Sequence, residues 1–303
     1  MTENVIETKE LTVYYGKHLG IKDVNLTVKQ GEVFGFLGPN GAGKTTTQRA
    51  LMDVIHPTSG TALIFGKDSQ IDGVEIRKNI GYLPGELHLY PNMKAKNFLD
   101  MLASLQEKRI DTHYRQDLYS RLGFDPSRKI KEYSRGNRQK VGIIAAFMSK
   151  PDLLILDEPT GGLDPLVQQT VMELVREVKA DGRTVFFSSH VLPEVQAVCD
   201  RVGIIRDGEL IQTSPVDTLT KQTFKRIHIT FQNMPPADAF TSNGVTETGR
   251  DDNTVMLEVR SDLAKVMEIA VPYGIDDLDT PHVTLEEIFL SFYDRSNNGH
   301  GGK

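Results

Sequence analysis

The stretch from Gly38 to Thr46 constrains this chain more than any other. It reads GPNGAGKTT and fits G-x-x-x-x-G-K-[ST], the pattern of a phosphate-binding P-loop. Residues 32–37 before it form a short, mostly apolar run typical of a buried strand, and residues 46–52 after it can continue as a helix. A glycine-rich loop between a strand and a helix N-terminus turns backbone N–H groups towards phosphates. We therefore predict that the chain binds a nucleoside triphosphate.

Each position of this loop is a candidate nucleotide contact, because a P-loop holds phosphates largely through its backbone. The ammonium group of Lys44 is expected to reach the β- and γ-phosphates, and the Thr45 hydroxyl to bind Mg²⁺. The predicted contacts are Gly38, Pro39, Asn40, Gly41, Ala42, Gly43, Lys44, Thr45 and Thr46.

Two carboxylates follow the apolar run at residues 153–156. A buried strand that ends in paired acids, downstream of a P-loop, is typical of a P-loop enzyme. Asp157 is then expected to hold Mg²⁺, and Glu158 to accept a proton from the attacking water. The alternative, a solvated acidic turn, does not explain why the strand before it is apolar throughout.

Two other residues have less specific local signals. His190 ends a further apolar run, residues 184–189, and the carboxyl ends of strands bind ligands in open α/β sheets. It is a candidate γ-phosphate contact, although a lone histidine is more often structural. Tyr15 precedes Gly16, and its local sequence favours a half-buried strand tyrosine over a ring that stacks on adenine.

Composition excludes several classes of protein. The net charge is 35 − 41 = −6, which does not indicate a nucleic-acid-binding surface, so no nucleic acid partner is expected. Cys199 is the single cysteine, which suits a reducing compartment. No secretory signal is expected from the first residues, and apolar runs such as 143–148 are far shorter than the ~20 residues that span a bilayer. We expect any membrane role to come through a partner.

The pattern of strands and helices predicts an α/β fold. Alternation up to about Leu210 indicates a mainly parallel, doubly wound core in a domain of residues 1–215. A helical subdomain is expected at about residues 87–149. Residues 11–15 and 24–28 are predicted as edge strands that precede the P-loop strand.

The remaining sequence predicts a second, small α+β domain at residues 224–295, followed by a disordered tail at 296–303. Strands are expected at 226–231 and 254–259, with helices at 263–270 and 285–292. The pattern is compatible with a β-α-β-β-α-β arrangement resembling a ferredoxin-like fold. No catalytic constellation is visible here.

The order of motifs resembles the ATP-binding subunit of an ATP-binding-cassette (ABC) transporter over residues 6–213. Residues 133–137 (YSRGN) are similar to the family's signature loop, 153–159 to its Walker B strand and 162–164 to its D-loop. His190 takes the place of its switch histidine. Tyr15 falls at the adenine-stacking position, so the resemblance reverses the local interpretation of this residue.

The resemblance implies a P-loop ATPase that works as a dimer, homo- or heteromeric. Lys44, Glu158 and His190 are the implied catalytic residues, with ATP and Mg²⁺ as cofactors. Ser134, the Gly136 backbone and Asp164 would complete the ATP site of a second subunit. Closure around two ATP molecules would drive an integral-membrane permease, which places the chain in the cytoplasm, peripheral on the inner face of the cell membrane.

The sequence departs from the family pattern at two positions. Gly85 stands where the glutamine of the Q-loop is expected, the loop that faces the membrane partner. Unless Glu86 substitutes for that glutamine, the attacking water is expected to be held less well and turnover to be slower. Arg135 replaces the first glycine of the signature. Its side chain must either point away from the nucleotide or bring positive charge towards the phosphates.

The C-terminal segment favours one branch of the family. Residues 284–289 are similar to the terminal helix motif of drug and antibiotic exporters, so an exporter is favoured over an importer. The first alternative is a soluble ABC ATPase that is not coupled to a transporter, but such relatives usually have a long coiled coil, two fused cassettes or no appendix. The second is a module that binds ATP without hydrolysing it, and Glu158 argues against it. The sequence does not name the transported substrate.

Overall fold

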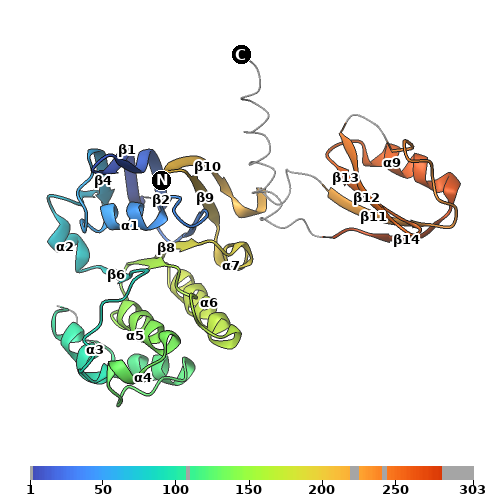
Figure 1. Cartoon of the computed structure of the whole chain (residues 1–303). Coiled ribbons are helices and arrows are strands. Elements are labelled where there is room, and N and C mark those ends of the chain that lie inside the picture. The colour runs from blue at the N-terminus through green and yellow to red at the C-terminus, as the bar shows by residue number, and fades with distance from the viewer. Residues whose placement is uncertain (1–2, 107–109, 219–224, 241–243, 282–303) are drawn as a thin grey trace. The chain divides into compact units, whose positions relative to one another are not determined.

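The computed structural model describes residues 3–106, 110–218, 225–240 and 244–281. The chain divides into two compact units, Met1–Pro215 and Val216–Lys303, each with its own sheets (Figure 1). In the described ranges, no helix is both long and apolar enough to cross a membrane.

A six-stranded sheet forms the centre of the first unit. Its order is β10-β9-β3-β8-β7-β6, and all neighbouring pairs are parallel except β10 with β9. The strands are β3 (Val33–Leu37), β6 (Ile80–Leu83), β7 (Leu153–Asp157), β8 (Thr184–Ser189), β9 (Arg201–Arg206) and β10 (Glu209–Pro215). β3, β7 and β8 are buried at every residue, as expected for parallel strands covered on both faces. The predicted parallel α/β core is confirmed.

A second sheet of four antiparallel strands has the order β2-β1-β4-β5. It contains β1 (Asn4–Tyr15), β2 (His18–Lys29), β4 (Ser59–Ile64) and β5 (Lys67–Asp68). The strands predicted at 11–15 and 24–28 are present within β1 and β2, but both are longer than predicted. The edge position is confirmed for β2 and wrong for β1, which lies between β2 and β4. Only two residues separate β1 from β2, and such a short connection joins antiparallel strands, whereas a parallel pair needs a long crossover.

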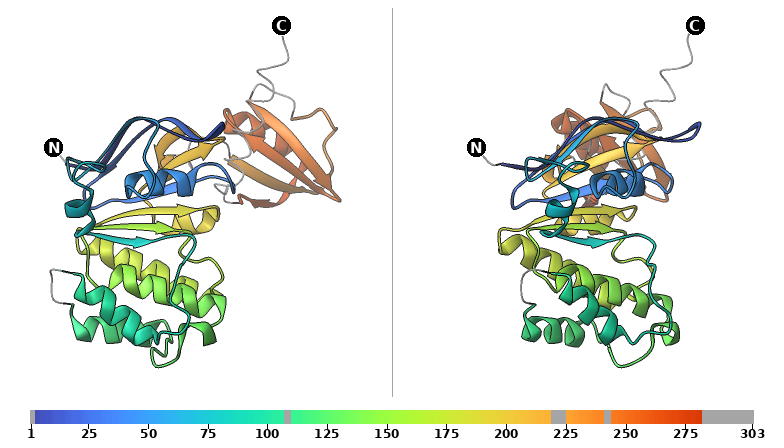
Figure 2. Two further views of the ribbon diagram at one scale, coloured as in Figure 1. Left: turned by 60° about the vertical axis from the view of Figure 1, so that its left-hand side comes forward. Right: turned by 90° about the vertical axis from the view of Figure 1, so that its left-hand side faces the viewer.

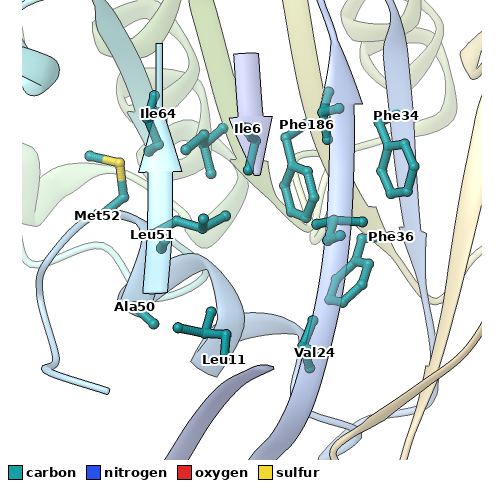
Figure 3. Close-up of a cluster of buried hydrophobic side chains, with 14 of the residues drawn as sticks. Ile6, Leu11, Val24, Phe34, Phe36, Ala50, Leu51, Met52, Ile64 and Phe186 are labelled. Atoms are coloured by element: carbon teal, nitrogen blue, oxygen red, sulfur yellow. The ribbon is translucent and has the colours of Figure 1, made fainter. Parts of the chain in front are cut away.

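The main hydrophobic core lies between these two sheets. Helix α1 (Lys44–Leu51) contacts β2 and β4 of one sheet and β7 of the other. Figure 3 shows side chains of both sheets meeting around it, and Phe34 stacks on Phe186 with ring centroids 5.9 Å apart. Burying one such side chain contributes about 1.5–3 kcal/mol, so this layer fixes the position of the P-loop that precedes α1.

Helices cover the opposite face of the parallel sheet (Figure 2). The helices of the first unit after α1 are α2 (Gly73–Arg77), α3 (Ala95–Ser104), α4 (Thr112–Arg121), the 3₁₀ turn η1 (Ile130–Glu132), α5 (Arg135–Phe147), α6 (Pro165–Ala180) and α7 (Leu192–Val198). Within the predicted helical insertion, α5 packs against α3, α4 and β6. The fold is thus the P-loop core with a helical insertion that the sequence predicts.

The second unit is α+β, as predicted. Its antiparallel sheet has the order β12-β13-β11-β14 and its own hydrophobic core. The elements are β11 (Lys225–Phe231), β12 (Val245–Asp251), β13 (Thr254–Val259), α9 (Leu263–Ala270), η2 (Val271–Tyr273) and β14 (Ile275–Asp279).

One helix of the β-α-β-β-α-β arrangement is missing from the described part of this unit. Residues 232–240, between β11 and β12, form bends and turns. Pro235 and Pro236 explain this, because proline lacks the N–H that a helix interior needs. The predicted helix at 285–292 and the tail at 296–303 lie outside the described residues.

Candidate ATP site

The P-loop connects β3 to α1, as the sequence predicts. A Cβ on Gly38 would lie 2.4 Å from the Ile205 carbonyl oxygen, so no other residue fits that position without a backbone shift. Gly43, with φ of 109°, precedes the first residue of α1, and left-handed backbone of this kind favours glycine. The loop therefore turns tightly into the helix N-terminus, where backbone N–H groups lack partners within the helix.

The Lys44 side chain lies inside this loop. Its Nζ donates to the carbonyl oxygens of Gly38 at 2.6 Å and Pro39 at 3.1 Å, and the side chain is 7% exposed. Nζ also lies 3.3 Å from Glu158 Oε1. The positive charge is thereby held at the loop where phosphates are expected.

Asp157 lies at the carboxyl end of β7, 1% exposed, and accepts two hydroxyl hydrogen bonds. Thr45 Oγ1 donates to one carboxylate oxygen at 2.7 Å, and Ser188 Oγ donates to the other at 2.6 Å. The two predicted Mg²⁺ ligands thus touch each other. A hydroxyl and a carboxylate beside a phosphate loop fit Mg²⁺, which takes oxygen ligands and is usually bound by one or two carboxylates together with substrate phosphates.

Sequence reasoning missed Ser188. It lies on β8, two residues before His190, and β8 pairs with β7 so that Asp157 and Ser188 are opposite each other. The polar end of the apolar run at 184–189 was the available signal, but only the strand register brings this hydroxyl to Asp157.

Glu158 follows β7 in a left-handed backbone conformation, with φ of 49°. This region costs a non-glycine residue about 1–2 kcal/mol. Neighbouring strand β8 holds the turn in place, because the Glu158 N–H donates to the Ser188 carbonyl oxygen at 3.2 Å and lies 3.3 Å from Ser188 Oγ. His190 Nδ1 lies 2.7 Å from Glu158 Oε2. The structure therefore brings together the acid and the histidine that the sequence separates by 32 residues.

Tyr15 lies beside the P-loop at the end of β1. Its hydroxyl is 3.4 Å from Thr46 Oγ1, and the residue is 45% exposed. The ring is therefore accessible next to the loop.

The signature residues and Asp164 form a separate group. Ser134 caps α5 by accepting from the Asn137 N–H at 3.3 Å, and Asp164 caps α6 by accepting from the Val167 N–H at 3.1 Å. A Cβ on Gly136 would lie 2.8 Å from the Gly162 carbonyl oxygen. In the described residues, these hydrogen bonds go to the helix N-termini and not to the P-loop.

Arg135, the unexpected residue of the signature loop, lies against the D-loop of its own chain. Its Cδ and Nε are 3.5 Å from the place that a Cβ on Gly162 would take. The exposed Arg135 side chain thus lies along Gly162 of the D-loop.

Gly85, the departure in the Q-loop, lies beside the carboxylate of Asp157. A Cβ there would lie 2.8 Å from Asp157 Oδ2, so any side chain would displace one of the two groups. Glu86 lines a cavity of about 430 Å³ together with Arg49 and Tyr82. Burial, and then the charge of Asp157, raise the pKa of Tyr82 to about 12.

The proteins to which this chain is similar belong to one family. A family profile described as ABC transporter matches residues 21–161. The chain is 34% identical to the ABC transporter ATP-binding protein YcbN of Bacillus subtilis over 298 residues, which cover 94% of this chain and 96% of YcbN. It is 38% identical to the bacitracin transport ATP-binding protein BcrA of Bacillus licheniformis, over 73% of each chain.

Solved structures agree with this assignment. An ATP-binding subunit of an ABC transporter aligns with a TM-score of 0.66 at 28% identity, over 72% of this chain and 92% of the other. The dimeric bacterial cassette MJ0796 shares the fold, with a TM-score of 0.64 at 24% identity, over 70% of this chain and 98% of the other. The chain belongs to the ABC transporter family. It is an ATP-binding subunit, and it hydrolyses ATP to energise a transporter.

Proposed function

We propose that this chain powers an exporter, working from the cytoplasmic face of the membrane on a separate integral-membrane permease. The similarity to BcrA, named as a bacitracin transport protein, supports an export role. YcbN aligns with the second unit as well as the first, so the proposal concerns a subunit with both units.

The observation that carries the catalytic proposal is the set of contacts from Lys44 through Glu158 to His190, at 3.3 and 2.7 Å. Lys44 would bind the β- and γ-phosphates, and Glu158, at the same end of the sheet, would accept a proton from the attacking water. His190 would orient that carboxylate and contact the γ-phosphate.

Thr45 and Asp157 would hold Mg²⁺, whose charge neutralises the phosphate oxygens. Ser188 fixes the Asp157 carboxylate through the 2.6 Å hydrogen bond to its second oxygen. The accessible ring of Tyr15 beside the P-loop is suited to stack on the adenine.

A second subunit would complete each ATP site. Ser134 and Asp164 accept hydrogen bonds from backbone N–H groups of α5 and α6 in their own chain. These bonds do not involve the P-loop, so the signature residues and Asp164 would serve the nucleotide of a partner chain. At the N-terminus of α5, the Gly136 N–H would face the γ-phosphate of that nucleotide. Two copies, or one copy and a related chain, would enclose two ATP molecules.

The permease would contact the cavity beside the Q-loop. This cavity is lined by Val54, Leu87 and Leu102 among other residues and carries the polar groups of Glu86 and His88. An apolar cleft with a few polar groups suits a short segment of a partner protein.

One experiment tests the proposal as a whole. A tagged Glu158→Gln chain should bind Mg-ATP as the parent does, form a stable dimer, and hydrolyse ATP at least about 100-fold more slowly, because a positioned general base contributes 10²–10⁴-fold. Purified from native membranes in mild detergent, it should carry a stoichiometric polytopic membrane protein.

The outcomes separate the parts of the proposal. Undiminished hydrolysis by Glu158→Gln would remove Glu158 as the base. A catalytically dead variant that purifies only with soluble proteins would replace the exporter by an ABC ATPase not coupled to transport. The parent chain, purified in parallel without nucleotide, is the control for dimer trapping.

A further inference from the structure

Helix α5 carries a side chain that reaches the catalytic turn. Gln139 Nε2 donates to the carbonyl oxygens of Glu158 at 3.3 Å and of Pro159 at 3.2 Å. Both carbonyls belong to the turn that leaves β7, so the amide holds the residue proposed as the base through its backbone.

The Glu158 backbone needs such support, because its φ of 49° lies in the left-handed region. The N–H side of this residue is held by Ser188 on β8, at 3.2 and 3.3 Å. On the carbonyl side, the Glu158 oxygen accepts from the Gly161 N–H within the turn at 3.1 Å and from Gln139 Nε2 at 3.3 Å, and Gln139 is the contact that comes from another element. The backbone of Glu158 is thus held by β8 and by the helical insertion, while Lys44 and His190 contact its carboxylate directly.

Helix α5 also packs against the Q-loop segment, which lies beside Asp157. A Cβ on Gly142 would lie 2.6 Å from Leu83 Cδ1 and 2.8 Å from Leu87 Cδ2, so α5 approaches the Q-loop segment as closely as glycine allows. Gly142, Leu87 and Ala145 also line the 430 Å³ cavity. A protein segment that enters the cavity would therefore press on α5.

We propose that Gln139 is a positioning residue, which keeps Glu158 in its catalytic conformation and makes that conformation depend on where α5 lies. In this proposal Gln139 acts through the Glu158 and Pro159 carbonyl oxygens, to which its amide donates. The inference rests on the proposed function, in which Glu158 is the base and the cavity receives the permease.

A matched pair of substitutions tests this role. Gln139→Met keeps the length of the side chain and removes its N–H donors, whereas Gln139→Lys keeps a donor at a similar reach. In the full chain, Gln139→Met should lower the kcat for Mg-ATP about tenfold, equivalent to ~1.4 kcal/mol, with KM and ATP affinity within about twofold of the parent. Gln139→Lys should restore at least about a third of the lost kcat.

Gln168 provides the control for loss of an amide in the same region. Its Nε2 donates to the Leu163 carbonyl oxygen at 3.1 Å, five residues after Glu158. Gln168→Met should change kcat less than about twofold, because this bond does not hold the base. Equal losses of kcat in the two methionine variants would indicate general loosening of the loop and would overturn the proposal.

A double-mutant cycle supplies the decisive readout. If Gln139 acts through Glu158, Gln139→Met should not slow the residual single-turnover hydrolysis of Glu158→Gln any further. Additive losses would mean that Gln139 acts elsewhere. If Glu158→Gln stops hydrolysis while Gln139→Met keeps the parental kcat, the inference fails and the proposed function stands. If Glu158→Gln itself hydrolyses normally, the proposed function fails first.

Discussion

The P-loop and the signature loop, the two groups proposed to surround ATP, are built differently. Around the P-loop, Lys44 and Asp157 are buried. Lys44 contacts its own loop and Glu158, and Asp157 contacts Thr45 of the loop and Ser188 of β8.

At the signature loop, Ser134 and Arg135 are exposed. Ser134 accepts a hydrogen bond from Asn137 of α5, and the Arg135 side chain lies next to Gly162.

This difference has a physical consequence under the proposed function. The P-loop group is organised before ATP arrives, so it can bind Mg-ATP in a single chain. The signature group offers exposed polar groups at a helix N-terminus, and it contributes only when another chain brings a nucleotide to it. Binding should therefore depend on the P-loop group alone, whereas hydrolysis should need both groups.

The largest expected effect tests this separation with a pair of variants. Lys44→Ala removes charge-assisted hydrogen bonds worth about 1.5–3 kcal/mol and should weaken ATP binding by about 10- to 100-fold. Gly136→Ala introduces a Cβ 2.8 Å from the Gly162 carbonyl oxygen, so it should keep single-chain ATP affinity within about twofold and lower hydrolysis at least about tenfold.

Fluorescent-ATP binding and phosphate release measure the two effects, and melting curves confirm folding. If Gly136→Ala weakened ATP binding by a monomeric chain as much as Lys44→Ala does, the two groups would not be separable. The P-loop group and the signature group would then not have separate roles in ATP binding and hydrolysis.

A smaller effect is expected at Gly85, next to the buried carboxylate. Gly85→Ala places a Cβ 2.8 Å from Asp157 Oδ2 and should raise the Mg²⁺ concentration needed for half-maximal hydrolysis by about tenfold, because displaced neighbours of a metal ligand cost 10–100-fold in affinity. Gly85→Gln carries the same Cβ and should therefore also lower the rate of ATP hydrolysis. The family pattern suggests the opposite, because a glutamine at this position would hold the attacking water better.

The control for this prediction is Gly249→Ala, since a Cβ there meets only Met256 Sδ at 3.6 Å. A Mg²⁺ titration of ATP hydrolysis compares the variants. An unchanged titration midpoint in Gly85→Ala would show that Asp157 tolerates a side chain beside it.

The smallest effect concerns Tyr82, at the edge of the same group. Its pKa is raised from 10.0 to about 12, first by burial and then by Asp157. Between these pH values the unfolded chain loses the phenolic proton more readily than the folded chain, so Tyr82 contributes stability below pH 10 that is lost as pH rises through about 12. Tyr82→Phe should therefore lose less stability over this range than the parent.

Urea unfolding at about pH 9.5 and pH 11.5 measures the difference between Tyr82→Phe and the parent. Tyr90→Phe, at an exposed ring, is the control. Equal alkaline losses in Tyr82→Phe and the parent would contradict the assignment.

Much of the fold and of the candidate site could be predicted where neighbouring residues carry the signal. The P-loop, the apolar strand before Asp157 and the helix at 263–270 are local patterns, and the structure has each of them. The edge position predicted for residues 11–15 was wrong, because β1 lies between β2 and β4 and local propensity does not say which strands pair.

The sequence by itself determined the phosphate loop and the order of the motifs, since spacing along the chain is enough to specify them. Only the tertiary structure decided that Ser188 meets Asp157, that Gln139 contacts the turn at Glu158, and that a side chain at position 85 would meet Asp157. These contacts join residues from 19 to 72 positions apart, across strand register and helix packing. The physical reason is that such contacts form only when the core between the sheets and helices closes, and no local pattern encodes that closure.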